Sequence, residues 1–154
     1  MTLEEKISQD LSSKFNLAPE AIKIPRPRRI SVEVSVENFL TVFEYIAKHL
    51  GFGHLCTITG LDEQDKITCI YHLANDNGIL INLKKSVSKE NPVIKSVIHQ
   101  FPGAEIYERE LVDLLGVKVE GLPEGNRYPL TDDWPKGEYP LRKDWKNKDE
   151  VPNA

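Results

Sequence analysis

A β-hairpin is predicted from residues 66–84, KITCIYHLANDNGILINLK. Its two halves, Lys66–Ala74 and Ile79–Lys84, are rich in the β-branched and aromatic residues that favour strands. The sequence Asn75-Asp76-Asn77-Gly78 between them is typical of a tight turn. Another strand is expected around Leu55–Thr59, before a turn-like polar stretch. The middle of the chain therefore predicts an antiparallel meander.

Two helices and a strand are expected upstream of this meander. Thr2 and Glu5 fit a capping box, and apolar residues then recur every fourth position as on one face of a helix. Apolar and polar residues alternate over Ile30–Val36, which predicts a half-buried strand. A second helix is expected over Glu37–His49, with Gly51 as its terminator.

Two more helices are expected downstream. Asn91 and Pro92 resemble the start of a helix that continues to Phe101. After a Pro-Gly break, the last helix is expected over Ala104–Leu115 and ends at Gly116. The core is expected to include Leu11, Val32, Val34, Phe43, Ile46, Ile58, Cys69, Tyr71, Ile81 and Ile98.

The predicted fold is a two-layer α+β domain over residues 1–120, with helices on one face of a mixed, largely antiparallel sheet. Residues 121–154 are expected to form an irregular, extended C-terminal arm, because five of the ten prolines lie there. The arm also contains Trp134 and Trp145, whereas disordered tails are poor in aromatic residues. These residues are therefore predicted to occupy pockets, either on this domain or on another chain.

Composition excludes several classes of protein. The 154 residues carry a formal net charge of −4, which disfavours a nucleic-acid role, although Arg26, Arg28 and Arg29 form one basic cluster. No apolar run reaches the roughly 18 residues of a membrane span, and the acidic start does not resemble a signal peptide. Any membrane association is therefore expected to go through partners.

A metal site is the only candidate for chemistry on this chain. His54, Cys56, Cys69 and His72 would meet if their two strands paired, and these residue types bind zinc. The two cysteines are too few for an iron–sulfur cluster, which normally needs four thiolates. A small metal-binding protein is therefore kept as the alternative function.

The helix predicted over Ala104–Leu115 is densely charged. Glu105, Arg109 and Asp113 stand four residues apart and could form a ladder of ion pairs on a solvated face. Alternatively, these charges fix the helix against a partner or against the loop that follows.

This helix also carries a family resemblance. The sequence Tyr107-Glu108-Arg109-Glu110-Leu111-Val112-Asp113-Leu114-Leu115-Gly116-Val117 resembles the signature of the C-subunit family of respiratory NADH dehydrogenase. Downstream, Asp132-Asp133-Trp134 and Pro140-Leu141-Arg142-Lys143-Asp144-Trp145 resemble its closing motif. The likeness covers roughly Leu55–Trp145. The family's Gly-His-Pro is replaced by Gly121-Leu122-Pro123, which resembles more closely the subunits of energy-converting nickel–iron hydrogenases, including formate hydrogenlyase.

The resemblance implies a non-catalytic structural subunit of a membrane-associated oxidoreductase. It would dock on the large catalytic subunit, in the part of the complex that projects from the membrane (its peripheral arm). The small iron–sulfur subunit is the other implied partner. Iron–sulfur clusters and the nickel–iron or quinone site are expected on those partners, and the complex on the cytoplasmic face of the membrane. The implied partner-binding residues are Glu108, Arg109, Glu110, Asp113, Gly116, Tyr128, Asp133, Trp134, Pro140, Leu141, Arg142, Lys143, Asp144 and Trp145.

Overall fold

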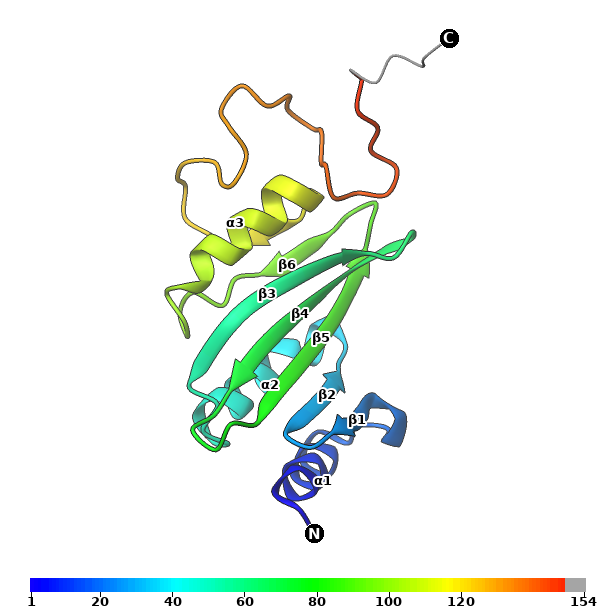
Figure 1. Ribbon diagram of the computed structural model, residues 1–154, viewed down its shortest axis with the longest axis vertical. Helices are drawn as coiled ribbons and strands as arrows, with labels where there is room; N and C mark the ends of the chain where they lie inside the picture. Colours follow the sequence, from blue (N-terminus) through cyan, green and yellow to red (C-terminus); the bar gives the residue numbers. More distant parts are fainter. Residues whose placement is uncertain (149–154) are drawn as a thin grey trace.

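The computed structural model of the protein describes residues 1–148. Within this range, runs of strands separate the α-helices along the chain, as Figure 1 shows. The elements are α1 Leu3–Phe15, the 3-10 helix η1 Pro19–Ala21, β1 Ile22–Arg26, β2 Arg29–Glu33, α2 Val36–Lys48, β3 His54–Asp62, β4 Lys66–Ala74, β5 Leu80–Ser88, β6 Val93–Lys95, α3 Ala104–Leu115 and β7 Lys118–Glu120.

Five strands form one sheet in the order β1-β2-β5-β4-β3. The predicted hairpin is confirmed as β4 and β5, which pair antiparallel with Ile67 opposite Val87 and Ala74 opposite Leu80. β3 adds antiparallel to β4, whereas β2 lies parallel to β5. The sheet is therefore mixed and largely antiparallel, as predicted.

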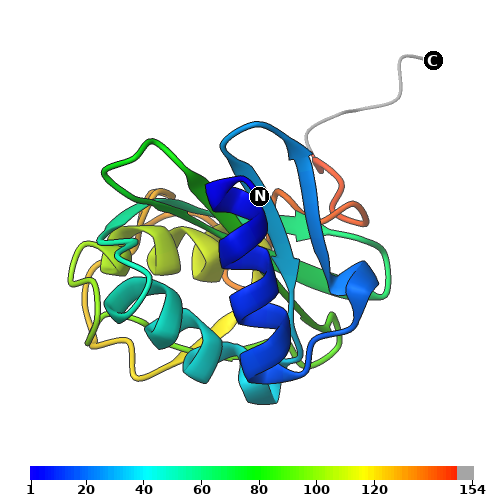
Figure 2. The ribbon, with the colours of Figure 1, turned by 90° about the horizontal axis from the view of Figure 1, so that it is seen from below.

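One face of this sheet is buried beneath the three helices (Figure 2). α2 sets the ring of Phe39 4.6 Å from that of Tyr71 in β4, measured between centroids. α3 packs Leu111 and Leu115 against Gly60 of β3, where no side chain separates helix from strand. α1 adds Ile7 and Leu11 to the same core. All ten predicted core residues are buried except Ile98, which is half-buried.

The other face of the sheet is polar. Thr59 and Asn82 flank His72 there, with Thr59 Oγ1 2.9 Å from His72 Nε2 and Asn82 Oδ1 2.8 Å from His72 Nδ1. Residues on this face are half-exposed or exposed along β5 at every second position. This alternation of inward apolar and outward polar side chains is what the sequence pattern predicts for a sheet covered on one side.

Most element ends follow local signals that the sequence shows. The capping box of α1 is present, since Thr2 Oγ1 accepts from Glu5 N and Glu5 accepts from Thr2 N. α3 has the predicted bounds and ends at Gly116 with φ of 71°.

The helix predicted after Asn91 is wrong. Residues Val93–Lys95 form β6, which pairs parallel with β7, Lys118–Glu120. The two strands lie on either side of α3 in the sequence, so a local sequence pattern could not predict that β6 pairs with β7. β1 was also missed, because Pro25 and Pro27 made its surroundings resemble a loop. Among the residues described, no helix has the length and apolar character to cross a membrane.

Candidate docking surface: α3 and the C-terminal arm

The C-terminal arm, residues 121–148 as described, runs around α3 and back to the end of the sheet (Figure 1). Residues 149–154 of the predicted arm lie outside the described range. The arm contains no helix or strand, but it is bonded to its own domain at successive points. Several residues of the motifs that resemble the NADH dehydrogenase C-subunit family form these bonds.

Glu108 is the first of these motif residues, and it faces inward. Its side chain is buried, and its carboxylate accepts hydrogen bonds from Ser96 Oγ and Val97 N, both at 2.7 Å. Burial raises the pKa of Glu108, while these two donors act in the opposite direction. Glu108 therefore ties α3 to the segment after β6.

Asp113 joins α3 to the start of the arm. It is buried and accepts from Arg127 Nε at 3.0 Å and from Leu130 N at 3.0 Å. Arg127 also donates to the carbonyl of Trp134 at 2.7 Å. The predicted ladder of Glu105, Arg109 and Asp113 is thus only half correct, because Asp113 pairs with the arm instead.

Arg109 holds the next stretch of the arm. It forms the predicted ion pair with Glu105 at 2.8 Å and also donates to the carbonyl of Pro123 at 2.8 Å. Its guanidinium covers Gly125 so closely that a Cβ atom there would lie 2.5 Å from it. The charges of α3 therefore fix the following loop, which was one of the two alternatives open from the sequence.

The C-terminal end of α3 is closed by residues 139–142 of the arm. The ring of Tyr139 lies against Gly116, and Leu141 N donates to the carbonyl of Leu114 at 3.0 Å. Arg142 Nε donates to the carbonyl of Leu115 at 2.7 Å, which places a cation where the helix dipole favours one.

Asp62, at the end of β3, anchors the last part of the arm. Its carboxylate accepts from Lys143 N and from Lys89 Nζ, both at 2.7 Å, and Lys89 also pairs with Asp144 at 3.0 Å. Burial alone would raise the pKa of Asp62, but hydrogen bonds from Lys89, Lys143 N and Gln64 N outweigh it and lower the pKa to about 2.

The two tryptophans pack on each other and stay half-buried. Their ring centroids are 5.8 Å apart, and Trp134 Nε1 donates to the carbonyl of Glu138 at 2.8 Å. Trp145 Nε1 donates to the Glu138 carboxylate at 3.3 Å, and Lys148 pairs with the same group. The rings thus fill no deep pocket of their own domain.

Apolar side chains remain on the outer side of this assembly. Tyr128 and Leu141 in the arm are 42% and 53% exposed, and Ile106 on α3 is 48% exposed. Leu141 and Glu110 also line a cavity of about 180 Å³ between α3 and β3. The arm is therefore bonded to its domain largely through polar groups, while Tyr128 and Leu141 keep about half of their surface exposed.

Most of the predicted partner-binding residues bond or pack within the chain: Glu108, Arg109, Asp113, Gly116, Trp134, Leu141, Arg142, Lys143, Asp144 and Trp145. Tyr128 and Leu141 are the large apolar side chains among the predicted residues that stay exposed, and Glu110, Asp133 and Pro140 are exposed or half-buried. Sequence reasoning did not predict that Arg127 and Asp62 bond α3 and β3 to the arm, since no local pattern shows which distant groups a lone arginine or aspartate will contact.

The four proposed metal ligands do not come together. Cys69 faces the core, whereas His72 faces the polar side of the sheet, because the two are three residues apart on one strand. No group of three potential ligands that could hold a metal ion occurs among residues 1–148. The metal-binding alternative is therefore not favoured.

The basic cluster Arg26, Arg28 and Arg29 spans the β1–β2 turn, where Arg28 has φ of 61°.

Comparison with known proteins indicates the same family as the motifs do. Residues 32–151 match the family described as the respiratory-chain NADH dehydrogenase 30 kDa subunit. The chain is 37% identical over 145 residues to the C subunit of the F(420)H(2) dehydrogenase of Methanosarcina mazei, covering 90% of this chain and 89% of that one. It is 31% identical to formate hydrogenlyase subunit 5 of Escherichia coli, covering 92% of this chain and 26% of the relative.

A solved structure shares the fold. A chain of the membrane-bound sulfane sulfur reductase, an archaeal respiratory membrane complex, superposes with a TM-score of 0.76 at 29% identity, covering 92% of this chain and 85% of that one. Relatives occur in dehydrogenase and in hydrogenlyase complexes alike, so the closer resemblance to hydrogenases stays a prediction. Family match, motifs and fold agree: the chain belongs to the family of the 30 kDa subunit of respiratory-chain NADH dehydrogenase.

Proposed function

We propose that this chain is a non-catalytic structural subunit of a multi-subunit, membrane-associated oxidoreductase and docks on its large catalytic subunit. The observation that carries the proposal is the two-sided arm: polar bonds to α3 on the inside and exposed Tyr128 and Leu141 on the outside. Large apolar groups that stay exposed in an otherwise ordered surface are typical of contact sites.

The family supports the same role. Its relatives are named as subunits of dehydrogenase and hydrogenlyase complexes. On this proposal the redox centres, whether iron–sulfur, nickel–iron or quinone, belong to the large subunit and the small iron–sulfur subunit. The chain would then lie on the cytoplasmic face of the membrane, held there by the complex.

Assembly of the complex tests the proposal. Leu141→Ser removes an outward apolar group and is expected to lower the amount of large subunit that co-purifies with a tagged chain by about tenfold, since a central apolar contact contributes roughly 1–3 kcal/mol. The matched control is Ile24→Ser, because Ile24 is 39% exposed on β1, in a different part of the chain. Equal co-purification of both variants with wild type would contradict docking through the arm.

A further inference from the structure

A buried lysine lies on the apolar face of β5. Lys85 stands opposite Cys69 in the strand register and is only 1% exposed. Its Nζ lies 3.7 Å from the centre of the Phe39 ring and 5.1 Å from that of Tyr71. Among residues 1–148, the amino group of Lys85 has no hydrogen-bond or ion-pair partner, and its charge lies beside the rings of Phe39 and Tyr71.

This arrangement is costly for the isolated domain. Buried ammonium groups are normally paired with a carboxylate, and cation–π contacts replace only about 2 kcal/mol of the lost hydration. Burial lowers the pKa of Lys85 to about 8, although Cys69 and Glu108 act in the opposite direction. The group therefore still carries its charge at neutral pH but lacks a counter-ion in contact with it.

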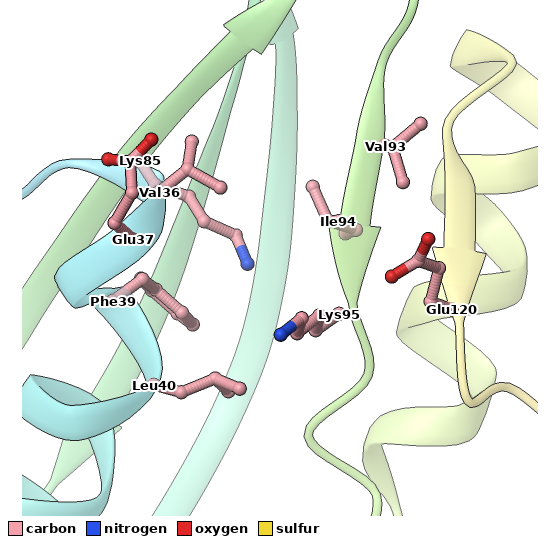
Figure 3. A pocket seen from close by; sticks show the side chains of 9 residues that line it. All are labelled: Val36, Glu37, Phe39, Leu40, Lys85, Val93, Ile94, Lys95 and Glu120. Atoms are coloured by element: carbon pink, nitrogen blue, oxygen red, sulfur yellow. The ribbon is translucent and has the colours of Figure 1, made fainter.

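The amino group of Lys85 opens on a pocket. A cavity of about 300 Å³ lies between α2 and β6, and Figure 3 shows the amino groups of Lys85 and Lys95 directed into it. Apolar side chains form most of its walls, namely Val36, Phe39, Leu40, Val93 and Ile94. An apolar pocket with a cation at its inner end has the composition of a site for a carboxylate on an apolar stem.

The other charged groups of the pocket restrict the ligand further. Glu37 and Glu120 also line it and balance the charges of Lys85 and Lys95, so that the pocket has no net positive charge to hold a free polyvalent anion such as phosphate. A single carboxylate that is attached to a larger docked surface does not need a net positive pocket, because the rest of that surface contributes to binding. A side chain of a neighbouring protein meets this condition better than a free small acid.

We propose that the pocket between α2 and β6 receives an Asp or Glu side chain, or a C-terminal carboxylate, of a partner subunit, which pairs with Lys85. The stem of that residue would contact Phe39 and Ile94. This inference rests on the proposed role as a subunit, but it concerns a surface distinct from α3 and the arm.

Zero-length cross-linking of the assembled wild-type complex tests the contact. A carbodiimide activates a carboxylate, and an adjacent amine then displaces the urea to leave an isopeptide bond. Peptide mass spectrometry is expected to find Lys85 joined to a carboxylate of another subunit. Linkage only to Glu37, Glu108 or Glu120 of the same chain, or no linkage of Lys85, would overturn the proposal.

A variant separates stability from assembly. Lys85→Met is expected to leave the melting temperature of the isolated chain unchanged or raise it, since it removes a buried unpaired charge. The same change should weaken retention in the complex about tenfold or more. The control is Lys84→Met, because Lys84 precedes it on the opposite, half-exposed face of β5 and should change neither quantity.

The outcomes distinguish this inference from the proposed function. If wild type and Lys84→Met do not assemble with any large subunit, the proposed function fails. If both assemble and Lys85→Met assembles equally well, only the pocket proposal fails. A Lys85→Met chain with a lowered melting temperature and unchanged retention would likewise show that the ammonium serves its own domain.

Discussion

The ring of Tyr139 lies directly over Gly116, so that a Cβ atom at residue 116 would come within 2.5 Å of it. The glycine is required twice, because its φ of 71° also lies in the left-handed region that side chains disfavour. Gly116 thus both ends α3 and leaves room for the arm to pack its Tyr139 ring there.

Gly116→Ala is expected to destabilise the chain by about 1–3 kcal/mol, because the methyl group strains the backbone and displaces Tyr139. Urea unfolding of the isolated chain measures the loss. Gly53→Ala is the control, since no atom lies within 4 Å of a Cβ there, and its effect should stay within about 0.5 kcal/mol. Equal effects of the two changes would mean that Tyr139 does not rest on α3.

The ion pair of Asp113 and Arg127 is expected to stabilise the chain more than a surface pair does. A double-mutant cycle with Asp113→Ala and Arg127→Ala should give a coupling energy of about 1–2 kcal/mol, because both groups are largely shielded from water. The pair of Glu105 and Arg109, with Glu105 half-exposed, should give less than about 0.5 kcal/mol. A coupling near zero for the first pair would show that the arm does not depend on it.

Acid should weaken the anchor at Asp62. Its pKa is lowered to about 2 in the folded chain, so its contribution is complete above the unfolded pKa and is lost as pH falls from about 5 towards 2. The loss is on the order of 1–2 kcal/mol. Unfolding of wild type and Asp62→Asn measured across this range should converge at low pH, whereas parallel curves would contradict the assignment.

Arg142→Ala should loosen the arm while the sheet and α2 stay folded. The change removes the donor to the Leu115 carbonyl and the contact of its guanidinium with the Tyr139 ring. Trypsin is therefore expected to cut after Lys136 several-fold faster than in wild type, with no comparable gain within β4. Arg26→Ala, at the β1–β2 turn, is the control. An unchanged cleavage rate at Lys136 would show that Arg142 does not hold the arm.

Local signals in the sequence predicted much of the fold. Thr2 and Glu5 cap α1, the tight turn after Ala74 places β4 beside β5, and Gly116 ends α3. Each of these features depends on residues within a few positions of one another. The β6–β7 pair was not predictable in this way, because each strand has three residues and its partner lies beyond α3.

The sequence motif predicted which residues of α3 belong to the candidate site, but not the contacts that they make within the chain. Glu108 and Asp113 belong to the quoted signature, yet both are buried and bond within the chain. Their partners, Val97 N and Arg127, lie in loops, and a periodic sequence pattern does not predict where a loop runs. Lys85 was missed for a related reason, since the predicted strand stopped at Lys84 and the inward register of the next residue was not considered.

The proposed docking places the exposed apolar residues of the arm against the large subunit. A photo-reactive phenylalanine analogue in place of Leu141, irradiated in the assembled complex, tests it most directly. Mass spectrometry is expected to identify peptides of the large subunit joined to residue 141. Adducts with solvent alone, or with this chain alone, in a complex that retains the large subunit would contradict it.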